Sequence, residues 1–360
     1  MQVKRSWLAG AIGVLAVLVF SISTLGTPET QGPQLKPAEP VGLERQIEVG
    51  MQIKTIYNLS LKDKTFSADG WFWLKWPQSI QNRIEAEQIP ITELVELTNQ
   101  VRSYDSRLEA DSNEPQKLPS GRYLQLFRFS STFYDDQQNL RNFPFESLEL
   151  PISVEIRPSQ FSMGEQGLVL IPQANTKELP GDSVNLNGYR RVGERSTAAI
   201  HAYRTSFGEE GVANAGDYSN VTFELTYRTN GWAAFYRFVL PWLAVMVILL
   251  LVPNLEGNLN DLRLAIPSTA LLTLVFLQGN AHADLPPLDY LTFLDKLYLF
   301  GYVAATAEFW LFVWGTNLIC RSAREQHEQV MARINRVDLS YQVATLLGGL
   351  CLLLLGRVGG

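Results

Sequence analysis

Hydrophobic and polar positions follow two different patterns in the two halves of the chain. From about residue 30 to 230, short runs that alternate apolar and polar residues are separated by Gly, Pro, Asn and Asp. A period of two is typical of β-strands with one buried face. From about residue 235 onward, long apolar runs dominate. The pattern therefore predicts an all-β domain followed by an all-α membrane domain.

The alternating runs of the first half are short and numerous, as expected of a β-sandwich over residues 45–232. We expect a turn at 58–64 and a short helix near 91–100. The expected strands are 47–57, 65–76, 123–134, 148–156, 197–205 and 221–228.

Four apolar segments predict a four-helix transmembrane domain over residues 233–360, because about 17 to 25 residues suit a bilayer span. They lie at about 233–252, 264–281, 297–319 and 339–355. The connection between the third and fourth segments is rich in arginine, at Arg321, Arg324, Arg333 and Arg336. The positive-inside rule makes that connection cytoplasmic, which puts the β-domain on the outer side.

The first 26 residues have the form of a targeting segment. Lys4 and Arg5 precede an apolar run from Leu8 to Phe20, and small residues follow. A cleaved signal peptide and a retained signal anchor both fit this pattern, and both export the chain that follows. Residues 27–44 are rich in Pro, Gly and Gln and are expected to be a linker.

Composition argues against several classes of function. A net charge of −6 offers no basic surface for nucleic acid. The two cysteines both lie in apolar segments, which excludes a disulfide framework in the β-domain. The three histidines are widely spaced, and no catalytic or metal-binding motif is evident. We therefore expect no enzyme activity, no catalytic residue, no metal site and no cofactor.

The second apolar segment differs from the others because polar residues interrupt it. At helical spacing one stripe is small or polar near the cytoplasmic end and bulky in the middle. A slightly polar helix inside a monomeric bundle would explain such a stripe, and so would a pore in a symmetric ring, with a hydrophobic constriction. The candidate pore-lining residues are Asp261, Ala265, Thr269, Leu272, Phe276, Gly279 and Asn280.

Four stretches resemble the pentameric ligand-gated ion channel family, the relatives of nicotinic and glycine receptors. They are Phe143-Pro144-Phe145-Glu146, Leu240-Pro241, Leu285-Pro286-Pro287-Leu288-Asp289-Tyr290 and the Trp71…Trp76 spacing. The cysteines that bracket the first motif in animal members are absent, as in bacterial members. The resemblance implies a homopentamer in the bacterial inner (cell) membrane, surrounded by lipid, with a periplasmic or extracellular N-terminal domain.

The resemblance also implies a pore assignment. Leu272 matches the family's leucine gate, Thr269 a polar ring one turn below it, and Asp261 an acidic ring at the cytoplasmic mouth. Five carboxylates there would attract monovalent cations. Asp261 could instead cap the helix, and Leu262 holds the other position at which the acidic ring occurs. Pro267 departs from the family pattern and could kink the helix.

Gating in the family couples two loops of the sandwich to the loop after the pore helix. Here the resemblance assigns this role to Lys62, Asp63, Phe143, Pro144, Phe145, Glu146, Arg228, Pro286 and Pro287. A solvated turn is the alternative for Lys62 and Asp63. Arg228 stands one residue before the basic position that pairs with the motif's acid, so it could face away from Glu146.

Family ligands bind between subunits, and the matching positions are Trp71, Glu155, Arg157 and Tyr218. Trp71 could also be a core residue. Glu155 and Arg157 project from the same strand face and could simply pair with each other. Because arginine favours carboxylate or phosphate, we expect an anionic or zwitterionic small molecule, or protons, rather than an amine. Tyr218 falls in the segment 208–220, which we expect to be a flexible loop over the site.

The sequence thus predicts a subunit of a pentameric ligand-gated channel that conducts cations. A membrane-anchored β-sandwich sensor or binding protein without ion conduction is the alternative. The stripe on the second apolar segment distinguishes the two, because an anchor needs neither an acidic mouth nor an apolar constriction.

Overall fold

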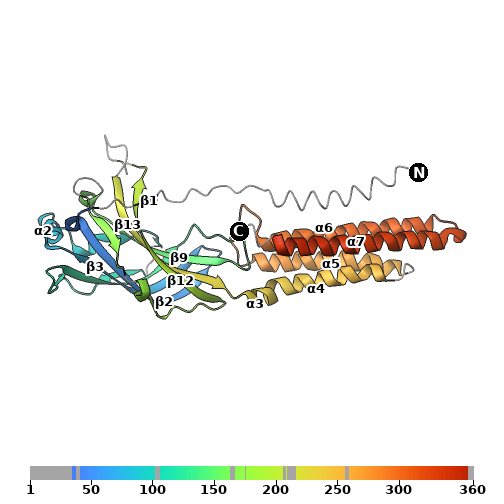
Figure 1. Cartoon of the computed structure of the whole chain (residues 1–360), viewed down its shortest axis with the longest axis horizontal. Coiled ribbons are helices and arrows are strands. Elements are labelled where there is room, and N and C mark those ends of the chain that lie inside the picture. The colour runs from blue at the N-terminus through green and yellow to red at the C-terminus, as the bar shows by residue number, and fades with distance from the viewer. Residues whose placement is uncertain are drawn as a thin grey trace. The chain divides into compact units, whose positions relative to one another are not determined.

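The structure is a computed structural model that describes residues 35–37, 41–101, 106–162, 167–174, 176–205, 208, 216–255 and 259–355. The predicted signal segment at 1–26 lies outside the described residues, as does most of the predicted linker at 27–44. The described chain divides into two compact units (Figure 1). The strand unit holds Glu29–Gln138 and Ser147–Thr229, and the helical unit holds Asn139–Glu146 and the chain from Asn230 onward.

The strand unit is a β-sandwich-like pair of sheets, as the alternating pattern predicts. One sheet has the order β1 (Leu35–Pro37), β12 (Tyr189–Tyr203), β13 (Gly216–Thr229), β9 (Ser147–Ile156) and β4 (Val95–Leu97). The other has the order β10 (Val169–Pro172), β2 (Gln46–Ser60), β3 (Thr65–Trp76), β8 (Tyr123–Tyr134) and β5 (Gln100–Val101). Three short strands join the second sheet: β11 (Pro180–Ser183) on β2, and β6 (Arg107–Ala110) and β7 (Gln116–Lys117) on β8.

Alternate residues of the long strands fill the core of the strand unit. On β3 the even-numbered positions, such as Phe72 and Leu74, are fully buried, whereas Trp71 and Trp73 are partly exposed. The Phe72 ring stacks on Phe127 of β8 with 4.8 Å between centroids. Burying one face of each strand supplies the hydrophobic stabilisation of the sandwich and fixes strand register.

One local prediction for the strand unit is wrong, and one helix was not predicted. Residues 91–100 form no α-helix: a 3-10 turn at Ile91–Glu93 is followed by β4 and the start of β5. The only α-helix described in this unit is α2 (Gln78–Ala86), directly after Pro77, and the alternation pattern did not reveal it. Both segments are shorter than about three turns, where tertiary contacts outweigh local propensity.

The helical unit contains three helices long and apolar enough to cross a membrane: Gly231–Asn254, Asp261–His282 and Phe293–Cys320. The first is composite, with α3 (Gly231–Ala234), a π-turn η5 (Phe235–Val239), α4 (Leu240–Leu251) and a 3-10 turn (Val252–Asn254). The others are α5 (Asn260–His282) and α6 (Phe293–Cys320). The fourth predicted span lies within α7 (His327–Leu355), which is not among these three.

Proline accounts for the π-turn in the first helix. Pro241 lacks an amide hydrogen, and its ring crowds the carbonyl four residues earlier. The turn before it therefore widens to the π form over η5. In contrast, α5 continues through Pro267 as one helix.

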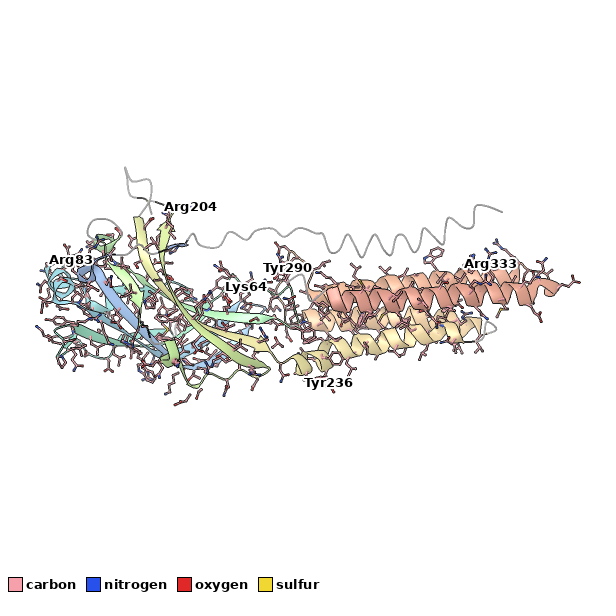
Figure 2. The ribbon with its side chains drawn as sticks, in the orientation of Figure 1. Lys64, Arg83, Arg204, Tyr236, Tyr290 and Arg333 are labelled. Atoms are coloured by element: carbon pink, nitrogen blue, oxygen red, sulfur yellow. The ribbon has the colours of Figure 1, made fainter. Side chains whose placement is uncertain are left out.

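Aromatic side chains are exposed at the beginning of the first composite helix. Trp232 is 72% exposed and Tyr236, labelled in Figure 2, is 61% exposed. Exposed Trp and Tyr at a helix end are typical of the boundary between water and a membrane. Together with the three apolar helices, they indicate a membrane protein.

Candidate functional site

The seven candidate pore-lining residues all lie on one exposed face of α5. Leu272 is 57% exposed and Phe276 69% exposed, and the other five are also exposed. The opposite face is buried, as the small or absent exposure of Ala270 and Leu274 shows. An exposed apolar face on an apolar helix is covered by lipid or by other subunits in a membrane protein.

Two threonine hydroxyls of α5, one of them on this face, are bonded within the helix. Thr269 donates its hydroxyl to the carbonyl of Ala265 at 3.0 Å, and Thr273 donates to the carbonyl of Thr269 at 2.9 Å. Such bonds let hydroxyls lie in an apolar setting without an unpaired donor. Each hydroxyl oxygen can still accept a hydrogen bond.

Asp261 lies in the first turn of α5 and is exposed. The N-cap residue is Leu259, without a side-chain cap, so the capping alternative for Asp261 is wrong. A carboxylate in the first turn is still stabilised by the positive end of the helix dipole. Its charge therefore remains available to the solvent at this end of the helix.

A buried ion pair anchors the same end of α5 to α7. The Arg263 guanidinium bonds the Asp338 carboxylate, and both side chains are almost fully buried, at 5% and 7% exposed. The guanidinium also lies over the Phe312 ring of α6, 4.3 Å from its centroid. Glu308 of α6 is buried beside the pair. These contacts turn the Arg263 side of α5 toward the interior of its own bundle.

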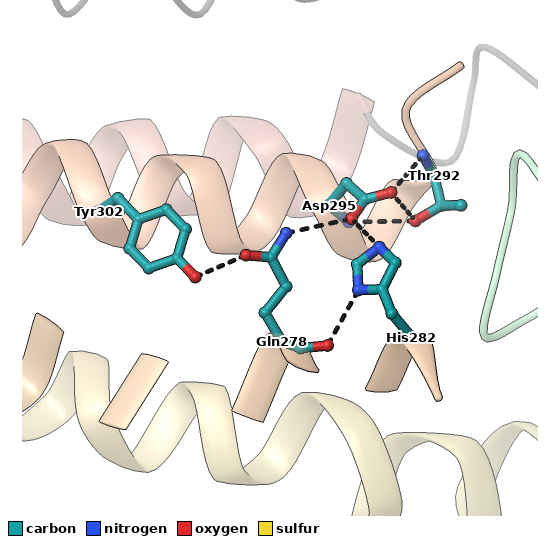
Figure 3. Close-up of polar contacts among 5 residues, drawn as sticks. All are labelled: Gln278, His282, Thr292, Asp295 and Tyr302. Atoms are coloured by element: carbon teal, nitrogen blue, oxygen red, sulfur yellow. Dashed lines mark hydrogen bonds and ion pairs between the residues drawn. The ribbon is translucent and has the colours of Figure 1, made fainter. Parts of the chain in front are cut away.

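A polar cluster holds the other end of α5 to α6, and Figure 3 shows how its members converge. His282 contacts Asp295 at 2.8 Å, and the Gln278 side chain receives the Tyr302 hydroxyl at 2.6 Å. Asp295 in turn accepts the amide and the hydroxyl of Thr292, at 2.9 and 2.7 Å, and completes a capping box at the start of α6.

The loop with the Phe-Pro-Phe motif packs on the helical unit, to which it belongs. Phe143 is buried against Phe238 at 5.0 Å, and Phe145 lies 6.1 Å from Phe293, between ring centroids. The amides of Phe293 and Leu294 donate to loop carbonyls, those of Arg141 at 2.7 Å and Phe143 at 3.2 Å. The loop therefore satisfies free donors in the first turn of α6.

The same loop reaches the connection between α5 and α6. The amide of Leu140 donates to the Tyr290 hydroxyl at 3.0 Å, and the Arg141 guanidinium lies 5.0 Å from the centroid of the Tyr290 ring (labelled in Figure 2). Within this connection Pro286 is buried and Pro287 is exposed. The loop belongs to the helical unit and joins β8 to β9 along the chain, so it is also a covalent connection between the two units.

The other predicted coupling residues have local environments that do not decide their role. Lys62 and Asp63 lie exposed in the turn after β2, where Asp63 exchanges hydrogen bonds with Ser60. Glu146 is buried in the helical unit, and Arg228 is exposed on β13. The pairing of Glu146 with Arg228 stays a prediction.

Of the candidate ligand residues, Glu155 lies at the centre of a buried polar cluster in the strand unit. It is 1% exposed, and its carboxylate receives the Tyr203 hydroxyl at 2.6 Å and the Asn220 amide at 3.1 Å. His201 Nδ1 contacts the same carboxylate at 2.9 Å. Both oxygens are thus occupied by donors from β12 and β13.

This cluster corrects the expected pairing of Glu155 with Arg157. Arg157 is exposed beyond the end of β9 and takes no part in the cluster. Tyr218 is only 8% exposed and makes an edge contact with the Tyr203 ring at 5.6 Å. It belongs to β13 rather than to a flexible loop, although 209–215 of the expected loop lie outside the described residues.

Trp71 is not a core residue, which removes the alternative interpretation of this position. It is partly exposed on β3, with the Lys54 ammonium 5.4 Å from its ring centroid. It belongs to the sheet that does not contain Glu155.

The cluster partners of Glu155 were not expected from the sequence. His201 and Tyr203 are two residues apart on β12, so alternation alone puts them on one face. What brings them to Glu155 is the register of β13 between β9 and β12, which pairs Asn220 with Glu155. The sequence contains no signal for that register.

Electrostatics within the cluster favour a charged His201. The hydrogen bond to Glu155 raises the pKa of His201, against the opposing effect of burial. Burial and the bond to Glu155 raise the pKa of Tyr203, so its hydroxyl stays protonated and donates. The cluster can therefore gain or lose one proton near neutral pH, at His201.

No protein-family model matches the sequence, and no characterised protein matches it. The likeness to pentameric channels rests on the motifs and their spacing.

The His201 cluster predicts a specific dependence of stability on pH. The contact with Glu155 raises the pKa of His201 above its ordinary 6.5. The contribution of the charged His201 to the free energy of unfolding is therefore fully present below about pH 6.5. The contribution is lost as the pH rises through the raised pKa. Thermal unfolding of the wild-type chain and His201→Gln should converge with rising pH and separate below about pH 6.5. His327→Gln, at an exposed position, is the matched control; a constant gap between wild type and His201→Gln would contradict the assignment.

The buried pair of Arg263 and Asp338 predicts a large cost for removing one partner. Asp338→Asn removes the carboxylate to which the buried Arg263 guanidinium bonds, which costs about 3–5 kcal/mol. Asp284→Asn disrupts the exposed pair with Arg237 and costs about 0–1 kcal/mol. Thermal or denaturant unfolding of the membrane-reconstituted chain measures both. Equal losses in the two variants would show that the buried pair is not an anchor.

Proposed function

We propose that the chain is one subunit of a homopentameric ligand-gated ion channel of a bacterial inner membrane, with the sandwich outside. The observation that carries the proposal is the exposed stripe of α5, which runs from Asp261 through Thr269 to Leu272 and Phe276. It changes along one helix from acidic to hydroxylic to bulky and apolar. A membrane anchor has no need of that gradient.

Five copies of this stripe around an axis would form a pore whose chemistry follows from the single helix. Rings of Leu272 and Phe276 would leave a dry constriction that stops ions. Rings of Thr269 would offer hydroxyl oxygens that replace part of a cation's water shell. Rings of Asp261 at the cytoplasmic mouth would concentrate monovalent cations and repel anions.

A homopentamer also explains why this face of α5 is exposed in the single chain. Isolated helix faces in a membrane protein are covered by lipid or by a further subunit, and a polar stripe favours water or protein over lipid. α7, whose later part holds the fourth apolar segment, packs on α6, where the Tyr341 hydroxyl donates to the Ala304 carbonyl; this contact supports a four-helix arrangement.

Gating requires that the sandwich act on the position of α5. The Phe-Pro-Phe loop is the physical route, because it continues β8 and β9 and packs on the start of α6 and on Tyr290. A ligand that changes the sandwich would displace this loop. The displacement would reach α5 through the short connection to α6.

The agonist we propose is a proton or an anionic or zwitterionic molecule, rather than an amine. Glu155 is the acid that would hold an amine, and its carboxylate already accepts three donors from its own chain. An incoming ammonium would have to displace one of them. Protonation of His201 strengthens the cluster without displacing anything.

Reversal potentials test the proposed conduction and its selectivity. The full chain, reconstituted in a planar bilayer under asymmetric salt, should pass current with a reversal potential near that of the cation. Asp261→Asn should move it toward zero, because the charge at the mouth is lost. Glu109→Gln removes an exposed carboxylate of the strand unit and should leave it unchanged.

Two outcomes would contradict the proposal. An absence of current over the range from pH 4 to 8, with an anionic and zwitterionic ligand panel, would argue for a sensor without conduction. A reversal potential that follows the anion, or that Asp261→Asn leaves unchanged, would remove Asp261 from the conduction path.

A further inference from the structure

His282 presents both ring nitrogens to groups that accept hydrogen bonds. Nδ1 lies 2.9 Å from the carbonyl oxygen of Gln278, and Nε2 lies 2.8 Å from Oδ1 of Asp295 (Figure 3). A carbonyl oxygen has no proton to give, so Nδ1 must carry the hydrogen of the first contact. A neutral imidazole then has a lone pair on Nε2, facing a carboxylate oxygen.

The second contact therefore needs one additional proton between Nε2 and Oδ1. The other bonds of Asp295 indicate which atom holds that proton. Its Oδ2 accepts from the amide and hydroxyl of Thr292, and its Oδ1 also faces the Gln278 side-chain amide at 3.5 Å. A carboxylate that receives this many donors is stabilised as the anion. With a hydrogen on Nε2 as well as on Nδ1, both ring nitrogens of His282 would donate, one to the Gln278 carbonyl and one to Asp295.

We propose that the pair of His282 and Asp295 is a proton-binding site that fastens the end of the pore helix α5 to the capped start of α6. Without the proton, the imidazole makes one of its two contacts and loses the ionic attraction to Asp295. Gln278, which receives the Tyr302 hydroxyl, is then a remaining polar contact between this end of α5 and α6.

Other charged groups near this site do not replace the bridge. Arg237 of η5 and Asp284, just after α5, pair with each other at 3.2 Å and are each 70% exposed. Lys296 follows Asp295 on α6 and has no role in the hydrogen bonds of the cluster in the described chain. Of these groups, only histidine ordinarily changes charge between about pH 5 and 8.

The position of the site suggests how it could regulate the chain. Asp295 caps the helix whose first amides donate to the Phe-Pro-Phe loop, so one turn of α6 joins that loop to His282. Proton binding would stiffen this junction and favour the conformation described here. Its effect on gating rests on the proposed channel function, but proton binding itself does not.

Double-mutant cycles on thermal stability test the site in the full, membrane-reconstituted chain. At about pH 5.5, His282→Ala should lower the Tm, and this loss should shrink severalfold when Asp295→Asn is already present. At about pH 8.5 the loss should be small in both backgrounds. A double-mutant cycle cancels the cost of each single variant, so the loss of the capping box in Asp295→Asn does not obscure the coupling. The titrations of His201 and of Asp135, whose pKa burial raises to about 6, are common to all four chains and cancel as well.

A second variant and a spectroscopic readout complete the test. His282→Gln retains a donor without a titratable proton and should make stability less dependent on pH than in wild type. In nitrogen-15 spectra of histidine-labelled chain, with His282→Gln identifying the signal, both ring nitrogens should be protonated at about pH 5.5 and one of them at about pH 8.5.

An unprotonated ring nitrogen at the lower pH, or equal losses from His282→Ala in both backgrounds at the lower pH, would overturn the proposal. Neither measurement requires ion flow, so the proton site can be demonstrated when no current is found. In that case the channel proposal fails and the proton site stands. Normal currents without coupling between His282 and Asp295 would instead support the channel and rule out the proton site.

Discussion

The buried bond between Arg263 and Asp338 constrains the rest of the helical unit. A guanidinium removed from water is stable only beside its counter-charge, so α5 cannot rotate about its axis without a cost of several kcal/mol. With Arg263 turned inward, a stripe about half a turn away must face outward. That stripe carries Thr269, Leu272 and Phe276, all exposed in the single chain. One ion pair thus selects which residues α5 presents to its surroundings.

The other end of α5 is held by weaker and more changeable contacts. His282 and Gln278 join it to α6 through exposed or half-buried polar groups, and the α6 cap is shared with the Phe-Pro-Phe loop. The two ends therefore differ: at one end both partners of the charge pair are buried, and at the other the exposed His282 contacts the buried Asp295. A helix anchored in this way can tilt at its His282 end while keeping its rotation, as gating of the proposed pore requires.

Period and composition were sufficient to predict the longer strands, the three apolar helices that the structure contains and the residues of the stripe on α5, because those features depend on local burial. They could not predict contacts set by strand register or by helix packing. Glu155 was singled out, but its partner proved to be His201 rather than Arg157, because β12 and β13 bring distant residues to it. No sequence pattern identified Asp338 as the partner of Arg263, because only the packing of α7 brings it to α5.

Cysteine accessibility along α5 tests most directly whether its exposed stripe lines a water-filled pore. In a chain whose Cys320 and Cys351 are replaced by serine, single cysteines would be introduced at Thr269, Leu272 and Phe276, and at Leu274 for comparison. The account predicts that a charged, water-soluble thiol reagent changes the current at the stripe positions and leaves it unchanged at the buried Leu274 position. Modification at the Leu274 position without any at the stripe would contradict it.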